Sequence, residues 1–126
     1  MKKFSPSWKS SKQRRKQRKY RLHAPLHIKQ KFMTSPLSKE LKAKYKKNAV
    51  TLRKGYKVKI MRGEYKKYIG KVVDIDLKKT RVHVEGIQHV KRSGTKTFYP
   101  LHPSNLQIIE AIFDDKKMRA KMEGRK

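Results

Sequence analysis

The stretch Arg53–Leu77 reads RKGYKVKIMRGEYKKYIGKVVDIDL and contains the clearest strand signal in the chain. Apolar and polar residues alternate on both sides of a polar loop bounded by glycines, which is the pattern of two strands joined by a loop. Gly55 permits a turn into the first strand, Gly63 lets the backbone approach a phosphate closely, and Gly70 is expected where a side chain would be obstructed. The stretch therefore predicts a strand–loop–strand unit.

The loop of this unit mixes basic and aromatic side chains. Lysines and arginines bind phosphates and tyrosines can stack on bases, a mixture that suits irregular RNA. The residues concerned are Arg62, Tyr65, Lys66, Lys67, Tyr68 and Lys71. The same residues also fit a plain exposed hairpin whose tyrosines belong to the core, and that alternative stays open at this point.

The two-residue period continues on both sides of the loop. Within residues 50–113, the alternating apolar positions are Val58 and Ile60, then Val73, Ile75 and Leu77, then Val82 and Val84, then Phe98 at the start of a strand, then Leu106 to Ile109. Glycines and prolines separate these segments. Five short antiparallel strands over so few residues predict a mainly β fold, a small barrel rather than a sandwich.

The chain is strongly basic, with 37 Lys and Arg against 9 Asp and Glu among 126 residues and a net charge of +28. Such an excess favours a polyanionic partner. No apolar run is long enough to span a membrane. The charged N-terminal residues are not followed by the apolar segment of a secretory signal. Cysteine is absent, which excludes disulfides and Cys-ligated zinc. We therefore expect an intracellular protein bound to nucleic acid, with no membrane partner.

The charge is unevenly distributed, since residues 1–49 carry 17 Lys and Arg against the single acid Glu40. The run Lys9–Arg21 has no apolar periodicity, so we expect it to be disordered in the free chain and ordered on phosphates. Asp114 and Asp115 stand at a plausible helix start in a tail that is either a short helix or disordered. The expected regions are a basic extended arm (1–34), a short helix with its linker (35–49), a barrel (50–113) and a C-terminal tail (114–126).

A short helix is expected at about residues 36–47. Ser35 or Ser38 can cap it, and Pro36 suits a first-turn position. Glu40 lies near the positive end of the helix dipole. The apolar stripe of this helix would be Leu37, Leu41 and Tyr45, which favours docking on the core.

Catalytic and metal-binding patterns are not found. Pro25 separates His23 from His27 and prevents a shared helical face for a metal. Residues 63–71 have six residues between their glycines and no Ser or Thr after the lysine, unlike a nucleotide-binding loop. We expect no enzyme activity, no cofactor, no metal and no small-molecule substrate.

The chain resembles a known family from about Ser11 to Asp115. It is similar to the universal KOW-domain proteins of the large ribosomal subunit, numbered twenty-four in the universal scheme and twenty-six in the older eukaryotic one, of the archaeal/eukaryotic type. The matching residues are the basic run to Arg21, Ala24-Pro25-Leu26-His27, Pro36-Leu37-Ser38, Glu40-Leu41, Tyr45, Arg53-Lys54-Gly55, Met61-Arg62-Gly63, Gly70-Lys71-Val72, Val84-Glu85-Gly86 and His102-Pro103-Ser104-Asn105. Two positions depart from the family pattern, because Tyr56 replaces a usual acid and Lys67 a usual glycine.

The resemblance implies an SH3-like five-stranded barrel with a KOW motif at about residues 53–80. It implies a cytoplasmic structural constituent of the large ribosomal subunit that binds its ribosomal RNA, supports early assembly and lies near the peptide exit tunnel. Its partners would be that RNA, neighbouring large-subunit proteins and factors docking at the tunnel exit. The first eight residues are extra, and the lack of a long C-terminal extension favours an archaeal source.

Combining charge and resemblance gives a set of expected RNA contacts. They are Lys12, Arg14, Arg15, Arg18, Arg21, His27, Arg53, Lys54, Arg62, Gly63, Lys66, Gly70, Lys71 and Arg92. The alternative function is that of a KOW-type transcription-elongation or chromatin protein. Elongation factors of that type carry a further α/β domain before the barrel, which residues 1–49 cannot form.

Overall fold

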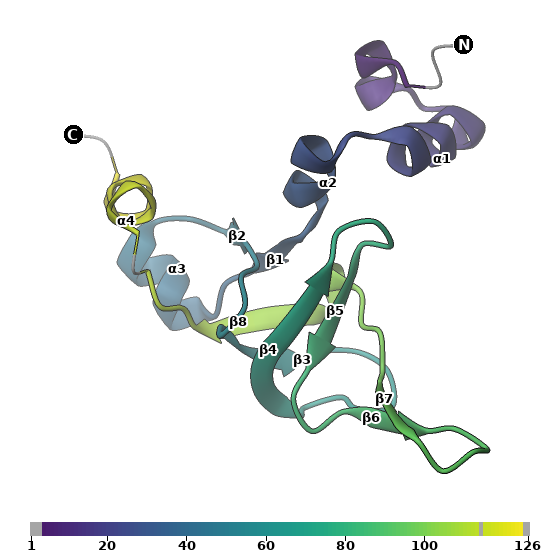
Figure 1. Cartoon of the computed structure of the whole chain (residues 1–126). Helices are drawn as coiled ribbons and strands as arrows, with labels where there is room; N and C mark the ends of the chain where they lie inside the picture. Colours follow the sequence, from purple (N-terminus) through teal and green to yellow (C-terminus); the bar gives the residue numbers. More distant parts are fainter. Residues whose placement is uncertain (1–3, 114, 125–126) are drawn as a thin grey trace.

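The computed structural model describes residues 4–113 and 115–124 of the chain. Along the chain, helices form the N-terminal part, most of the strands form the middle, and a helix forms the C-terminal part (Figure 1). The elements are η1 (Pro6–Ser10), α1 (Arg14–His23), α2 (Leu26–Phe32), β1 (Thr34–Pro36), α3 (Lys39–Tyr45), β2 (Ala49–Thr51), β3 (Lys57–Ile60), β4 (Ile69–Asp76), β5 (Arg81–Val84), β6 (Gln88–Val90), β7 (Lys96–Phe98), η2 (Pro103–Asn105), β8 (Leu106–Glu110) and α4 (Lys116–Glu123).

The centre of the molecule is a four-stranded antiparallel sheet with the order β5-β4-β3-β8. Single bridges extend both edges, where Leu37 pairs with Ile108 and Leu101 pairs with Val82. In the residues that the structure describes, the sheets do not close into a barrel. The fold is a mixture of helices and antiparallel strands, so the expected five-stranded SH3-like barrel is not confirmed.

The strand–loop–strand prediction is confirmed as β3, loop and β4, but one face assignment was wrong. Val72 is buried, whereas Val73 is 41% exposed. The register of β4 against β5 shifts between Val72 and Asp74, which marks a bulge. A bulge inserts one residue and reverses the alternation, so Val72 faces the core before it and Ile75 faces the core after it.

A second departure is the hairpin of β6 and β7, which projects from the sheet (Figure 1). Phe98 was expected to open a strand, but it ends β7 and pairs with Gln88. The residues of β6 and of the connecting turn are exposed, so this hairpin gains little from the core. The sequence of β6, the strand that pairs with β7, shows no alternation of apolar and polar residues that would have predicted it.

The N-terminal arm is helical rather than extended, which corrects the extended arm expected over residues 1–34. Tyr20 of α1 is buried, and its ring packs against Phe4 and Phe32, with centroids 5.2 and 6.0 Å away. The Gln17 side-chain amide donates hydrogen bonds to the carbonyl oxygens of Trp8 and Ser11. The aromatic partners lie outside the basic run, so periodicity within that run could not show them.

The expected helix at 36–47 is present as the shorter α3. The Ser38 hydroxyl accepts a hydrogen bond from the Leu41 backbone N–H, which identifies Ser38 as the cap. Pro36 belongs to β1 instead of the first helical turn. Ser35 is buried and its hydroxyl donates to the Pro103 carbonyl oxygen.

Leu41 and Tyr45 of the expected apolar stripe lie on α3 and pack against the core, whereas Leu37 is fully buried but precedes the helix and bridges to Ile108. In the C-terminal tail, the Asp115 carboxylate caps α4 by accepting from the Lys117 N–H. Asp114, the other expected helix-start acid, lies outside the described residues.

Candidate nucleic-acid interface

A groove of about 1250 Å³ lies between the helical arm and the β4–β5 turn. Its walls come from η1, α1 and α2 on one side and from β4, β5 and the chain around Phe98 to His102 on the other. The Nζ atom of Lys29, on α2, donates a hydrogen bond to the Lys78 carbonyl oxygen at 3.2 Å. This contact between residues far apart in sequence holds the two walls together.

The groove is strongly basic. Its Lys and Arg residues are Lys9, Arg18, Arg21, Lys31, Lys78, Lys79 and Arg81. The one carboxylate among the lining residues belongs to Asp76, and its Oδ1 accepts from the Lys79 backbone N–H at 3.0 Å. The ion pairs recorded among the described residues involve Arg53, Lys54 and Lys57, none of which lines the groove. The groove cations are therefore available to an anionic ligand.

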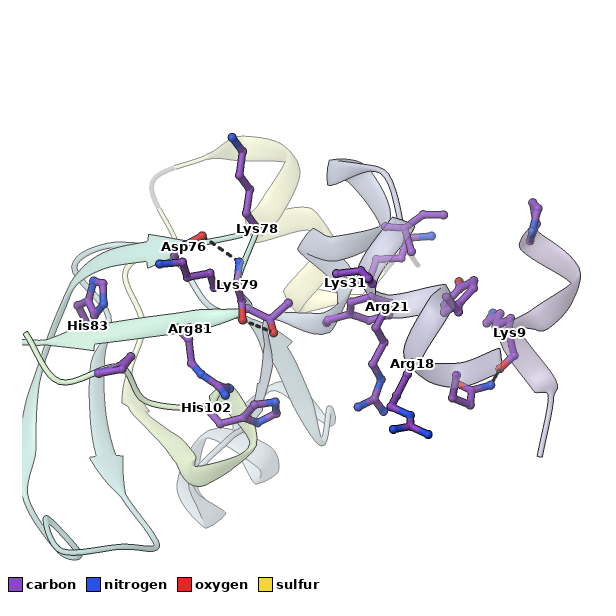
Figure 2. A pocket seen from close by; sticks show the side chains of 18 of the residues that line it. Lys9, Arg18, Arg21, Lys31, Asp76, Lys78, Lys79, Arg81, His83 and His102 are labelled. Carbon is purple, nitrogen blue, oxygen red and sulfur yellow. Dashed lines mark hydrogen bonds between the residues drawn. The ribbon is translucent and has the colours of Figure 1, made fainter. Parts of the chain in front are cut away.

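Three basic side chains and a histidine meet where α1 faces the strands. Arg18 and Arg21 extend from α1 on one wall, and Arg81 and His102 extend from the opposite wall, toward the same edge of the groove (Figure 2). Partial desolvation lowers the pKa of His102, and the nearby charges of Arg81 and Arg21 lower it further. His102 Nδ1 accepts from the Ser104 N–H, which fits a neutral ring. The two arginines already concentrate positive charge here and disfavour protonation of His102. A site with this excess of positive charge favours an anion.

The groove also contains aromatic surface. The rings of His83 and Phe98 stack with centroids 5.9 Å apart and an interplanar angle of 24°. Both side chains line the groove, and Phe98 is 38% exposed. Cationic groups beside a partly exposed aromatic ring match the two chemical parts of a nucleotide.

A second basic region is the β3–β4 loop. Arg62 and Lys66 are exposed, and Gly63 has a φ of +95° with open space around it. Lys67 has a φ of +75°, a conformation that glycine adopts without strain. Lys67, expected from the resemblance to depart from a glycine position, thus keeps a left-handed backbone.

The sequence left open whether the two loop tyrosines are available to stack on bases or belong to the core, and the structure differs for the two. Tyr65 is partly buried and packs against Tyr99, with ring centroids 5.5 Å apart. Tyr68 is 42% exposed, and its ring lies against Gly70 and Gly86. A Cβ on Gly70 would lie 2.8 Å from the Val84 side chain and 2.9 Å from the Glu85 carbonyl oxygen. The expected obstruction at Gly70 is therefore real.

The expected RNA contacts occupy several places instead of one. Arg18 and Arg21 line the groove. The others lie elsewhere: Lys12, Arg14 and Arg15 at the start of the arm, His27 on α2, Arg53 and Lys54 before β3, Arg62, Gly63, Lys66, Gly70 and Lys71 in and after the β3–β4 loop, and Arg92 in the β6–β7 turn. The chain thus offers a groove, a loop and a hairpin turn as separate basic surfaces.

Two expected contacts are engaged with carboxylates. Arg53 lies 3.9 Å from Asp115, and Lys54 Nζ lies 2.6 Å from Asp74 Oδ1. The hydrogen bond from Lys54, with one from the Ile75 backbone, holds the pKa of Asp74 below its usual value. These exposed pairs contribute little to stability. A phosphate would have to compete with a carboxylate at both positions.

Sequence reasoning missed most of the groove. The missed residues are Lys9, Lys31, Lys78, Lys79, Arg81, His83, Phe98 and His102. A basic turn, Lys78-Lys79-Thr80-Arg81, was visible between two strands and could have marked one wall. The opposite wall depends on α1 and α2 docking through Lys29, which no local pattern indicates.

Two further findings concern other kinds of site. Within residues 4–113 and 115–124, no three His, Asp or Glu side chains gather as they would around a metal ion. No helix in the described chain has the length and apolar character needed to cross a membrane.

A comparison with protein families identifies one match that covers most of the chain. The matching model is that of the ribosomal proteins numbered twenty-six in eukaryotes and twenty-four in archaea, and it covers residues 11–125, from the end of η1 through the sheet to α4. The match includes both walls of the groove apart from the residues of η1 that precede Ser11. The chain therefore belongs to this family of large-subunit ribosomal proteins, the eukaryotic twenty-six and archaeal twenty-four type.

Proposed function

We propose that this protein is a non-enzymatic structural constituent of the large ribosomal subunit and binds the ribosomal RNA of that subunit. The observation that carries the proposal is the groove between the arm and the strands. It brings Arg18, Arg21 and Arg81 together with a single carboxylate that is already engaged by backbone. An RNA backbone supplies the negative charges that this surface lacks.

The helical arm supports the same proposal. The ten residues of α1 include Arg14, Arg15, Lys16, Arg18, Lys19 and Arg21, with no acid in the first turn. Like charges so close together repel one another, which destabilises an isolated helix. RNA phosphates along its exposed side would remove that repulsion, so binding and arm folding would be coupled.

Membership in the family extends the proposal to place and role. The protein would reside in the cytoplasm as part of the large subunit, beside other large-subunit proteins, and act early in assembly near the peptide exit tunnel. Factors docking at the tunnel exit would be further partners. The β3–β4 unit would serve as a KOW motif.

Sedimentation of a lysate that contains the tagged full chain tests this function. The chain should travel with large-subunit particles and leave them when the RNA is digested. Recovery on DNA or on RNA polymerase, together with absence from the large-subunit fractions, would show instead a transcription or chromatin protein of the KOW type.

A further inference from the structure

The groove contains two kinds of surface that a paired RNA helix could not use together. Arg21 and Arg81 supply charge from opposite walls, and the stacked rings of His83 and Phe98 supply an aromatic face. In a duplex the faces of the bases are covered by their neighbours, so only phosphates, sugars and base edges are offered to a protein. Unpaired nucleotides offer phosphates and base faces at once.

The aromatic surface is already organised for stacking. His83 lies on β5, and Phe98 ends β7, so the pair joins the central sheet to the projecting hairpin. Their nearly parallel rings fix the orientation of Phe98, which remains 38% exposed beside the groove. A base stacked on Phe98 would continue an existing stack, with little loss of side-chain freedom on binding.

The size of the groove indicates more than one nucleotide. Its volume of about 1250 Å³ exceeds the roughly 300–1,000 Å³ of pockets that hold a single small molecule. The apolar lining is also divided, with Tyr20, Leu22 and Phe32 on the arm side and Phe98 and Pro100 on the strand side. A ligand that reaches both sides is longer than one base.

We propose that the groove holds a short unpaired segment of RNA, such as a bulge or loop, with a base on Phe98 and its phosphates between Arg21 and Arg81. The proposal rests on the proposed RNA-binding function and names the RNA structure that the groove selects. The Lys29–Lys78 contact sets the separation of the walls and so positions the charges against the aromatic face.

The test compares two RNA stems that differ only in a short bulge containing the fluorescent base 2-aminopurine. The full chain should bind the bulged stem about tenfold more tightly than the paired stem, because only the bulged stem offers a base face that can stack on Phe98. The 2-aminopurine fluorescence should be quenched on binding. Phe98→Leu keeps apolar volume but loses the ring, so it should abolish both the preference and the quenching.

The matched control is Tyr99→Leu. Tyr99 is the next residue and is similarly exposed, but it packs against Tyr65 and does not line the groove. This variant should keep the preference for the bulged stem, and Phe98→Trp should keep it as well. Unchanged binding of the paired stem by Phe98→Leu shows that the variant is folded.

Equal binding of bulged and paired stems, unaffected by Phe98→Leu, would overturn the groove inference and leave RNA binding intact. Failure of the full chain to bind either stem would instead contradict the proposed function itself. Loss of the preference in Tyr99→Leu but not in Phe98→Leu would place the unpaired bases outside the groove and also overturn the inference.

Discussion

The ammonium group of Lys29 donates a hydrogen bond to the carbonyl oxygen of Lys78, which follows it by 49 residues. Lys29 is only 8% exposed, and lysines are seldom so buried unless the charged group has a partner. The acceptor lies in the β4–β5 turn, where Thr80 has a φ of +54°. The arm is thus fastened to a tight turn, and this contact determines how α1 and α2 face the strands.

Lys29→Met should loosen the arm while leaving the groove cations in place. The methionine keeps an apolar stem but cannot donate to Lys78, which should lower the free energy of unfolding by about 1 kcal/mol. Amide hydrogen exchange in α2 should become faster. RNA affinity should fall as well, because the walls are no longer held in register. Lys39→Met, on the exposed start of α3, removes the same charge and should change neither exchange nor affinity.

Lys67→Gly should stabilise the protein. Lys67 has a φ of +75°, where a side chain adds about 1 kcal/mol of strain or more. Part of this gain is offset by the larger freedom of glycine in the unfolded chain, which leaves a net gain of about 0.5 kcal/mol. The neighbouring Lys66→Gly has no such strain to remove and should destabilise by about 0.5 kcal/mol or more. Urea unfolding checks both, and a loss of stability in Lys67→Gly would contradict the strain.

Gly86 and Tyr68 should be energetically coupled. A Cβ on Gly86 would collide with the Tyr68 hydroxyl oxygen, and Gly86 also has a φ of +80°. Gly86→Ala should cost about 2–3 kcal/mol from strain and overpacking together. In a Tyr68→Ala background the overpacking disappears and only the backbone strain remains. A double-mutant cycle should therefore give a coupling of about 1 kcal/mol, and simple additivity would refute the contact.

His102 should take up a proton when RNA binds. Its pKa is lowered by partial desolvation and by Arg81 and Arg21, so between that lowered value and 6.5 the unfolded chain binds more protons than the folded one. Folding stability from this group is complete above about pH 6.5 and is lost as the pH falls toward the folded value. Phosphates beside both arginines would oppose this lowering and raise the pKa of His102.

The protonation of His102 is measured by NMR titration of its ring in the free and RNA-bound chain. The bound form should titrate at higher pH, and RNA affinity should rise as the pH falls through the interval between the two pKa values. His102→Gln should flatten that part of the pH dependence. Identical titration of His102 in both forms would remove it from the RNA site.

Local patterns predicted the parts of the fold that depend on neighbouring residues. Ser38 and Glu40 mark the start of α3, and the alternation through Val58 and Ile60 marks β3. The β4 bulge could not be predicted, because two adjacent valines satisfy either phase of a two-residue period. Only the pairing with β5 selects Val72 for the core.

The helical arm and the groove could not be predicted from the sequence for a related reason, because both depend on contacts between distant residues. Tyr20 becomes a core residue only when Phe4 and Phe32 close around it, and Lys29 meets Lys78 only after the whole sheet has formed. Charge and family resemblance pointed to RNA, but they distributed the contacts along the chain. Long-range docking concentrates Arg21, Arg81 and His102 into one place.

The salt dependence of binding to a large-subunit ribosomal RNA fragment tests the central claim most directly. Each phosphate neutralised adds about 0.7–0.9 to the slope of log affinity against log salt, so the wild-type slope should be steep. Arg18→Gln/Arg21→Gln/Arg81→Gln should reduce that slope by about 2. The matched triple variant Lys39→Gln/Lys44→Gln/Lys117→Gln, which removes the same charge from exposed residues outside the groove, should leave it nearly unchanged. A flat wild-type slope, or equal losses in both triple variants, would contradict binding of RNA in the groove.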